Sequence, residues 1–429
     1  MSGKLWNRNF ILLITAQCLA MFGNAILGLI LPLFILDISG SPALFGMVMA
    51  MYFIPLIIMS PIGGVIADRG RKQRIMFGVD IGTLAVIALL ILALHVLTGN
   101  GYASAIAPIV IVKLMALATL NGLYNPVATS CLPFLVPEDK LVRANAAAEI
   151  IGFSVPNFAG PIIGGIVYAA FGIFPVLIAS VAIYAAAAVI DLLIRVPYVQ
   201  QPPMQDSLAA TLKNDIAQSL RFAKKENPSM GKIILIFALF SISSTGMIMI
   251  VLPVLITQTL GMYTGLVGLS YGIMMGGGIL GGIVISALEK KLPLQKAHWR
   301  LLLCGMVIAP VGLALFLGAP ASVSYIIVTA SAALVMLLSG TVSIQMYALI
   351  QQEAPEELVG KIIAVTISAI FVAFTVGQFF YAMLFERLSA LPWIVPLAAA
   401  LVTCAVAVCS GRHFRRIGVL PNSDTIHVK

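Results

Sequence analysis

Four ionisable side chains lie deep within apolar runs of the first half of the sequence: Asp80, Lys113, Glu149 and Asp191. A charge at membrane depth is costly, so each of these residues is a functional candidate by default. Carboxyl groups can bind and release protons, and a nearby lysine can hold a carboxylate until a proton displaces it. The pattern predicts proton-coupling chemistry, for which Glu149, Lys113 and Asp80 are the candidates.

We expect Glu149 and Lys113 to meet as a buried ion pair, because their apolar runs are consecutive and antiparallel. A proton on Glu149 would then release Lys113 toward a substrate cavity. The alternative is a static pair that only fixes the packing of the two runs. Asp80 and Asp191 lie about one to two turns from the ends of their runs. They are expected to reach Arg74 and Arg195, respectively, in a structural role.

Uncharged polar side chains within the apolar runs are candidates for the wall of a substrate cavity. Asn121 and Asn125 share a face with Lys113, which lies ~14 Å from the outer end of its run at 1.5 Å per residue. The second half has no charge deep in any run, only glutamines and hydroxyls. The full set of cavity candidates is Gln17, Asn24, Lys113, Asn121, Asn125, Asn157, Gln345 and Gln378.

Other chemistries lack the residues that they need. The four histidines fall at the ends of apolar runs or in tails, which argues against a metal site. No glycine-rich phosphate loop with a following lysine is present, so ATP hydrolysis is not expected. The five cysteines are scattered through apolar runs, as small core side chains are. We therefore expect no enzyme activity, no metal and no cofactor.

The elements that position these residues are membrane-spanning helices. The chain is 61% hydrophobic and 10% charged, with a mean hydropathy of +1.07, whereas about a quarter of a soluble domain is charged. A helix crosses ~30 Å of hydrocarbon with ~20 residues, which predicts an all-α membrane protein with about twelve transmembrane helices. The expected spans are 9–36, 42–67, 75–97, 103–128, 144–170, 172–195, 231–258, 262–288, 300–317, 322–350, 360–385 and 389–411.

The basic residues predict the orientation of these spans. With both termini in the cytoplasm, all of the 25 Lys and Arg residues except Lys113 and Arg387 lie in or beside cytoplasmic segments. The net charge of +9 is thus an orientation signal, and no nucleic-acid partner is expected. The prediction is a multi-pass protein of the cytoplasmic (inner) membrane.

A long polar stretch divides the chain in two. It opens with prolines, as extended linkers do, and continues with leucines and isoleucines at the spacing of an amphipathic helix on the membrane surface. The motifs LPLF (31–34) and LPVL (252–255) recur in the two halves, which favours two parallel six-helix repeats. The predicted domains are an N-terminal bundle (1–196), a linker with an amphipathic helix (197–230), a C-terminal bundle (231–411) and a cytoplasmic tail (412–429).

The stretch GGVIADRGRK, residues 63–72, resembles the loop signature of the major facilitator superfamily between its second and third spans. The alternative is a basic loop that only sets the orientation. The resemblance implies a fold of two six-helix bundles and a loop that lies beside the one between spans ten and eleven. We expect the basic and acidic loops to latch a cytoplasmic gate, since several weak ion pairs can bias two states separated by a few kcal/mol. The gate candidates are Gly64, Asp68, Arg69, Arg71, Lys72, Glu353, Glu356 and Glu357.

The stretch GFSVPNFAGPIIGG, residues 152–165, is similar to the antiporter motif of exporters in this superfamily. Glycines four residues apart let helix backbones approach closely, although such spacing alone often reflects packing only. In the fifth span, together with the loop signature, it favours export over uptake. The matching residues are Gly152, Gly160, Pro161, Gly164 and Gly165.

Over its whole length the chain resembles bacterial drug and macrolide efflux permeases of the superfamily. The resemblance implies a secondary exporter of small amphipathic compounds, driven by proton antiport and alternating access. The expected partners are a small-molecule substrate, protons and membrane lipid, and the expected state is a monomer. The alternatives are an uncoupled facilitator or a lipid or lysolipid flippase and, from another class, a non-transporting receptor or scaffold.

Overall fold

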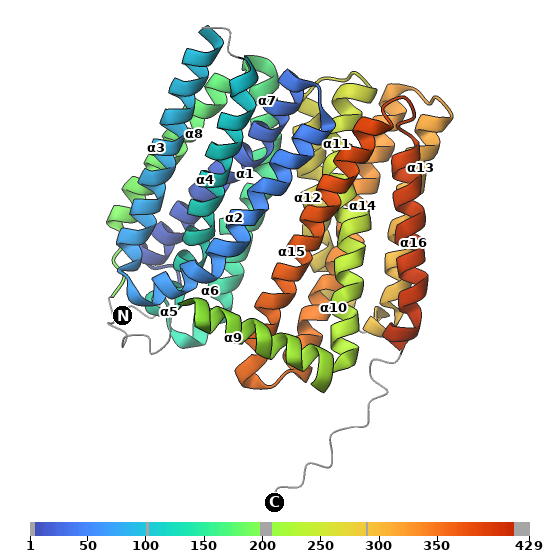
Figure 1. Ribbon diagram of the computed structural model, residues 1–429. Coiled ribbons are helices and arrows are strands. Elements are labelled where there is room, and N and C mark those ends of the chain that lie inside the picture. The colour runs from blue at the N-terminus through green and yellow to red at the C-terminus, as the bar shows by residue number, and fades with distance from the viewer. Residues whose placement is uncertain (1–4, 100–102, 198–207, 289–290, 416–429) are drawn as a thin grey trace, which may run out of the picture. The chain divides into compact units, whose positions relative to one another are not determined.

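The computed structural model describes residues 5–99, 103–197, 208–288 and 291–415. Every regular element within these ranges is helical (Figure 1). Twelve helices in them are long and apolar enough to cross a membrane, which confirms the prediction of an all-α membrane protein. These spans are Arg8–Ser39, Pro42–Met59, Lys72–Leu97, Ala105–Leu135, Glu138–Phe171, Ile173–Leu193, Pro228–Thr259, Gly265–Leu288, Leu294–Phe316, Ala321–Glu353, Leu358–Arg387 and Ile394–Arg415.

The contacts between residues divide the chain into two compact units. The first unit contains residues 1–205 and 252–275, and the second unit contains residues 206–251 and 276–429. Residues 252–275, which the predicted domain boundaries place in the C-terminal bundle, are thus grouped with the first unit.

The first unit is organised around one long, largely buried helix. Its main helices are α1 (Arg8–Ser39), α2 (Pro42–Arg69), α3 (Lys72–Gly99), α4 (Ala103–Thr129), α7 (Val155–Phe171) and α8 (Ile173–Leu193). Helix α1 is largely buried, and it packs against α2, α4, α7 and α8. Helix α3 packs between α4 and α8, and α2 packs against α4 (Figure 1).

Glycine sets the closest approach of α2 to α4. A Cβ atom on Gly63 would lie 2.9 Å from the carbonyl oxygen of Gly122, and one on Gly122 would lie 2.9 Å from the Cβ atom of Met59. Any larger side chain at Gly63 would therefore push the two backbones apart. This crossing holds α2 against α4, which carries the predicted cavity residues Lys113, Asn121 and Asn125.

Helix α7 is entered through an irregular segment. The short helix α6 (Leu141–Ala147) leads into η2, a π-helical segment over Ala148–Ser154, and Pro156 follows at the start of α7. Proline has no backbone N–H, so Pro156 cannot continue the regular hydrogen-bonding pattern of the preceding turn. The missing N–H is compatible with the wider π-helical turn that precedes it.

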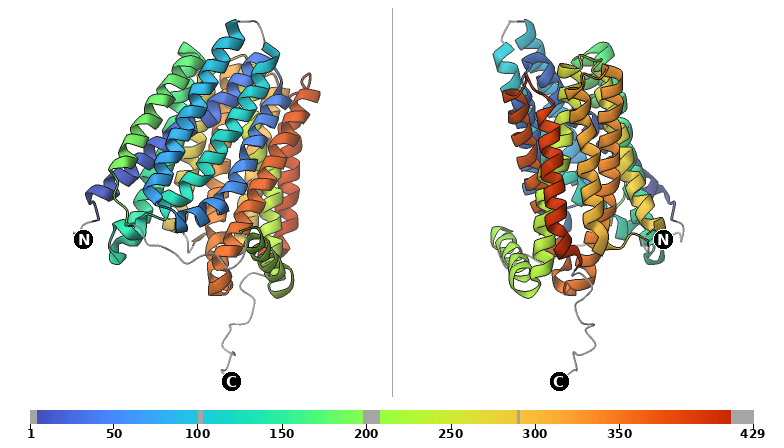
Figure 2. Two further views of the ribbon diagram at one scale, coloured as in Figure 1. Left: turned by 60° about the vertical axis from the view of Figure 1, so that its left-hand side comes forward. Right: turned by 90° about the vertical axis from the view of Figure 1, so that its right-hand side faces the viewer.

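The second unit is built from helices of the C-terminal half. They are α9 (Leu208–Arg221), α10 (Pro228–Phe240), α11 (Gly246–Val254), α12 (Gly265–Leu288), α13 (Ala297–Phe316), α14 (Ala321–Glu353), α15 (Glu356–Arg387) and α16 (Ile394–Arg415), although the end of α11 and the start of α12 belong to the first unit. Helix α13 packs against α14 and α16, which run beside it (Figure 2). Helix α10 packs against α15 and α16.

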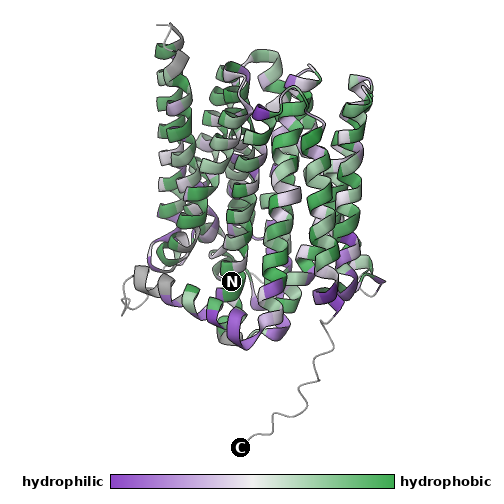
Figure 3. Ribbon diagram, turned by 45° about the vertical axis from the view of Figure 1, so that its right-hand side comes forward, coloured by the Kyte–Doolittle hydropathy of each residue, from purple (hydrophilic) through white to green (hydrophobic). Residues whose placement is uncertain are grey.

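Helix α9 has a different direction from the long helices of its unit. It runs across the ends of α10 and α15 (Figure 1) and contacts α15. Hydrophilic residues gather on α9 and at helix ends, whereas the long helices are mostly hydrophobic (Figure 3). Ile216 and Leu220, from the predicted apolar stripe, are 48% and 44% exposed. An exposed stripe of this kind suits the predicted position on a membrane surface.

Candidate functional site

Two buried acids meet in the first unit. Asp80 on α3 is 1% exposed and Asp191 on α8 is 0% exposed, and their carboxyl groups face each other within hydrogen-bonding reach. No donor in the described residues hydrogen-bonds to any of their four carboxyl oxygens. The expected ion pairs with Arg74 and Arg195 are therefore wrong for the described chain. The packing of α3 against α8 brings the two acids together instead.

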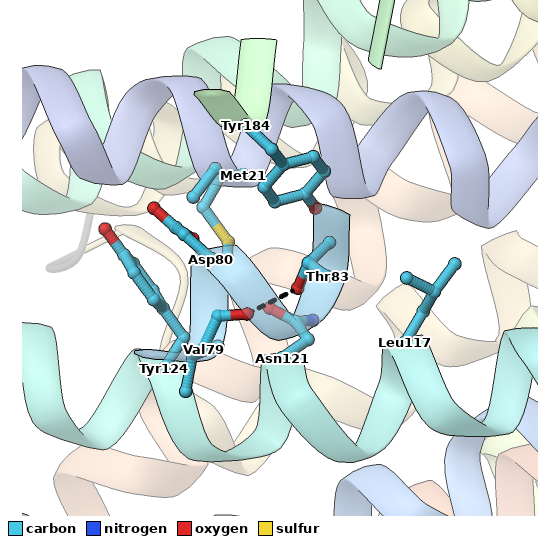
Figure 4. Close-up of a pocket in the computed structure, with 9 residues that line it drawn as sticks. Met21, Val79, Asp80, Thr83, Leu117, Asn121, Tyr124 and Tyr184 are labelled. Carbon is cyan, nitrogen blue, oxygen red and sulfur yellow. Dashed lines mark hydrogen bonds between the residues drawn. The ribbon is translucent and has the colours of Figure 1, made fainter. Parts of the chain in front are cut away.

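Asp80 also borders a small cavity between α1, α3, α4 and α8 (Figure 4). The cavity has a volume of about 10 Å³, which is close to what one water molecule requires. Thr83, Asn121, Tyr124 and Tyr184 line it together with Asp80. The hydroxyl of Thr83 donates to the carbonyl of Val79, and Tyr124 is 2% exposed with no hydrogen-bond partner for its hydroxyl in the described structure.

Asn121 connects this cavity to a hydrogen-bonded network. The hydroxyl of Tyr52 on α2 donates to Oδ1 of Asn24 on α1 over 3.0 Å, and Nδ2 of Asn121 on α4 is 3.4 Å from the same hydroxyl. The predicted cavity residues Asn24 and Asn121 are thus brought together. Tyr52, which joins them, was not among the candidates, because a tyrosine in an apolar run has no distinguishing pattern.

Lys113 and Glu149 do not form the expected ion pair in the described residues. Lys113 is half-buried on α4, whereas Glu149 is exposed on η2. The expectation assumed that consecutive helices pack together, but η2 packs against α1. A Cβ atom on Gly152 would lie only 2.8 Å from Cδ of Gln17, which shows how close η2 and α1 are.

The first unit also contains the predicted cavity residues Gln17, Asn157 and Asn125. Gln17 is buried at 5% exposure beside Gly152. Nδ2 of Asn157 donates to the carbonyl of Phe153, one turn earlier in η2. Asn125 is half-buried on α4, one turn beyond Asn121.

The gate candidates make contacts within their own units. Nζ of Lys72 donates to the carbonyl of Ala67 (2.6 Å) and to Oγ of Ser130 (3.1 Å). In the second unit, Oε2 of Glu353 accepts from Nδ2 of Asn227 over 2.7 Å. A Cβ atom on Gly64 would meet no described atom within 4 Å, whereas one on Gly63 would meet the backbone of α4.

The other gate candidates are Arg69, Arg71, Asp68, Glu356 and Glu357. Arg69 and Arg71 are exposed. The side chains of Asp68, Glu356 and Glu357 lie outside the described residues. The latch between the two loops stays a prediction.

The glycines of the predicted antiporter motif lie at close helix contacts. A Cβ atom on Gly160 would lie 2.9 Å from that of Ala25, and one on Gly164 would lie 3.1 Å from Cγ2 of Ile26, both on α1. A Cβ atom on Gly165 would lie 2.8 Å from Cα of Gly268. Gly165 therefore meets backbone, which cannot move aside as a side chain can.

The second unit contains a larger and less polar cavity. Its volume is about 280 Å³, near the lower end of the range for small-molecule pockets. No charged side chain lines it in the described part of the chain. The lining residues are Phe237, Phe240, Ser241, Thr245, Met249, Gly278, Met336, Ser339, Gly340, Ser343, Tyr347, Ile370, Phe371 and Phe374.

A buried cation was missed in the second unit, which was expected to have no charge deep in a span. Arg300 on α13 is 8% exposed and donates to Oγ1 of Thr341 (3.0 Å) and to Oε1 of Gln345. Gln345 in turn donates to the carbonyl of Leu292 over 2.6 Å. Gln378, the other predicted glutamine, is 0% exposed, and neither of its amide atoms has a partner in the described structure.

The fold and the buried groups of the two units indicate the class of protein. Membrane-length helices that enclose buried acids in one unit and an apolar cavity in the other are the arrangement of a multi-pass membrane transporter. The chain belongs to the Major Facilitator Superfamily, whose sequence model matches residues 13–378. The resemblance found in the sequence is thereby confirmed.

Individual relatives support the same family. Macrolide efflux protein A of Streptococcus pyogenes is 22% identical over 411 residues, which cover 94% of this chain and 96% of that protein. A POT family transporter in complex with 5-aminolevulinic acid has a TM-score of 0.73 at 11% identity, over 97% of this chain and 98% of that one. For a D-xylose-proton symporter the TM-score is 0.66 at 15% identity, over 94% and 96% of the two chains. At such identities the solved structures show the fold alone.

Proposed function

We propose that this transporter exports small amphipathic or hydrophobic compounds and is driven by proton antiport. The observation that carries the proposal is the cavity of the second unit, with its phenylalanines and methionines, its hydroxyls and its lack of charged lining residues in the described chain. An apolar wall with a few polar groups suits drug-like molecules. The aromatic faces also favour lipophilic cations.

Two further observations support the direction and the drive. The relative in Streptococcus pyogenes is a macrolide efflux protein that matches nearly the whole chain, and Gly160, Gly164 and Gly165 match an exporter motif at close helix contacts. The buried acids of the first unit supply groups that can bind a proton. In this proposal the protein works as a monomer in the cell membrane, with both termini in the cytoplasm.

Export is tested in bacterial cells that lack their own efflux pumps. Cells that express the protein should accumulate less of at least one macrolide or lipophilic cation from a broad panel than cells with an empty vector. A protonophore should raise accumulation to the control level. Uptake alone would show that the direction is wrong.

The same cells separate the proposal from an uncoupled facilitator or a lipid flippase. A facilitator would equilibrate the compound without responding to the protonophore. A lipid flippase would leave the accumulation of the panel compounds in these cells unchanged. In proteoliposomes it would move a fluorescent lysolipid from one leaflet of the membrane to the other.

A further inference from the structure

Asp80 and Asp191 meet in the first unit without the partners that buried acids normally have. Both side chains are at most 1% exposed, and no donor in the described structure reaches their carboxyl oxygens. Structural acids inside a protein are normally paired or hydrogen-bonded, because an isolated buried charge is very costly. This pair has neither form of compensation among the described residues.

Within the described chain, no cation faces the pair from the surrounding helices. Tyr124 and Cys131 approach it from α4 and the turn that follows, and Tyr184 approaches it from α8. The basic residue Lys72 interacts with Cys131 and not with either acid, and its Nζ donates to the carbonyl of Ala67 at the end of α2. Tyrosine and cysteine are neutral at physiological pH, so they cannot balance a negative charge on either carboxyl group.

A proton is the compensation that two facing carboxyl groups can supply. Two ionised carboxylates in contact repel strongly in a poorly polar environment, whereas one carboxylic acid can donate a hydrogen bond to one carboxylate. The remaining negative charge still has no cation beside it in the described structure, so a second proton can neutralise the pair.

We propose that Asp80 and Asp191 form one proton-binding site that exchanges a proton through the adjoining small cavity. The pair alternates between a state with one shared proton and one negative charge and a neutral state with two protons. On release, one O–H bond breaks, its electron pair stays on the carboxylate, and a water molecule in the cavity becomes hydronium. Binding is the reverse of these steps.

The cavity gives this site a connection to the rest of the first unit. Asp80 and Asn121 line the same space, and Asn121 also contacts the hydroxyl of Tyr52, which is bonded to Asn24. A change of charge at Asp80 therefore alters the electrostatic environment of the network that joins α1, α2 and α4. The role of this site as the source of the driving proton rests on the proposed export function. Its ability to bind a proton does not depend on that function.

Proton binding is measured directly by infrared titration of the purified full-length protein. We expect a carbonyl band of protonated carboxyl groups near neutral pH that shifts in heavy water. Asp80→Asn and Asp191→Asn should each reduce the band and change the proton affinity of the remaining acid at least about tenfold, which is about one pH unit. The matched control is Asp37→Asn, whose acid accepts a hydrogen bond from Tyr168 over 2.8 Å and should leave the midpoint unchanged.

Two results of this titration overturn the proposal. The first is a wild-type protein without a protonated-carboxyl band near neutral pH, a result that needs no variant and is therefore independent of folding. The second is a midpoint that moves with sodium concentration, because the pair would then be a sodium site. Gel filtration and the thermal midpoint identify variants that do not fold, and Asp191→Glu then replaces Asp191→Asn.

Coupling is measured in proteoliposomes with radiolabelled erythromycin. Both Asn variants should lose accumulation driven by a pH gradient and retain downhill exchange, and the Asp37→Asn variant should resemble the wild type. Accumulation that persists in both variants overturns the role of the pair in coupling. If the wild-type protein moves neither erythromycin nor any compound of the panel, the proposed function fails, and the infrared titration still decides the proton site.

Discussion

The two units bury polar groups of different kinds. In the first unit two acids meet beside a water-sized cavity and a network of amides and a tyrosine. In the second unit the buried polar groups are mostly hydroxyls, and the larger cavity is apolar and aromatic. Acids can change their charge with pH, whereas hydroxyls and phenyl rings cannot near neutrality. We infer that the first unit supports the chemistry of the ion and the second unit the binding of the compound.

The two units also have a feature in common, namely helices that touch at glycine. In the second unit a Cβ atom on Gly277 would overlap the carbonyl oxygen of Ala333, and one on Gly281 would overlap that of Leu337. In the first unit Gly63 and Gly165 have the same role. Close backbone contact is thus general to this membrane protein, and only the chemistry differs between the units.

The largest effect is expected where such a contact is backbone to backbone. Gly165→Leu should prevent most of the protein from folding and abolish transport, because the Cβ atom would overlap Cα of Gly268 at 2.8 Å. Overpacking typically costs about 1–3 kcal/mol and more where nothing can move. The measurement is the yield of monodisperse protein, with transport in the folded fraction.

Gly164→Leu and Gly78→Leu are the matched variants for this test. At Gly164 the neighbour is a side chain of Ile26, which can adjust, so the loss should be smaller. Gly78 has no described atom within 4 Å of the position that a Cβ atom would take, so its variant should fold normally. Equal yields for Gly165→Leu and Gly78→Leu would contradict the role of the contact.

The next prediction compares Arg300, a buried cation in the second unit, with Lys72, a half-buried cation in the first unit. Arg300→Met should lower the free energy of unfolding by about 2 kcal/mol, because it removes charged hydrogen bonds to Thr341 and Gln345. Lys72→Met in the first unit should lower the free energy of unfolding by about 1 kcal/mol, since Lys72 is half-buried and water can take its place as a hydrogen-bond donor. Thermal unfolding in detergent measures both, and a larger effect at Lys72 would contradict this ranking.

A third prediction concerns the apolar cavity. Phe374→Ala should raise the KM for an exported compound about tenfold, because loss of a ring from a binding pocket typically costs more than 1 kcal/mol. Phe380 on the same helix is 53% exposed, and Phe380→Ala should leave the KM unchanged. Concentration-dependent efflux measures the two values, and equal values would place the compound elsewhere.

Much of the fold was predictable from the sequence, because apolar runs of membrane length and the distribution of basic residues depend only on local composition. The site was less accessible. Asn24 and Asn121 were recognised as polar residues in apolar runs, but Asp80 was assigned to Arg74, and Glu149 to Lys113. Both errors have one cause, namely that sequence spacing does not show which helices touch.

The apolar cavity of the second unit was not predictable for a different reason. Phe371 and Phe374 are hydrophobic residues in a chain that is 61% hydrophobic, so nothing in their type separates a cavity wall from a lipid-facing surface. Arg300 was counted as a basic residue at a helix end. Its burial depends on Thr341 and Gln345, about 40 residues later in the chain, and no local pattern reveals such partners.

The smallest effect is expected at the hydroxyl that joins the network of the first unit. Tyr52→Phe keeps the ring and removes the oxygen that contacts both Asn24 and Asn121. One such hydrogen bond contributes about 1 kcal/mol, so the change should be a few-fold in rate and not a loss of folding. If the network responds to the proton site, the variant should weaken pH-driven accumulation more than downhill exchange. The control is Tyr263→Phe, whose ring is 55% exposed and should affect neither. Equal reductions of accumulation and exchange by Tyr52→Phe would show that the network only maintains packing, and the division between the units would then depend on the two acids alone.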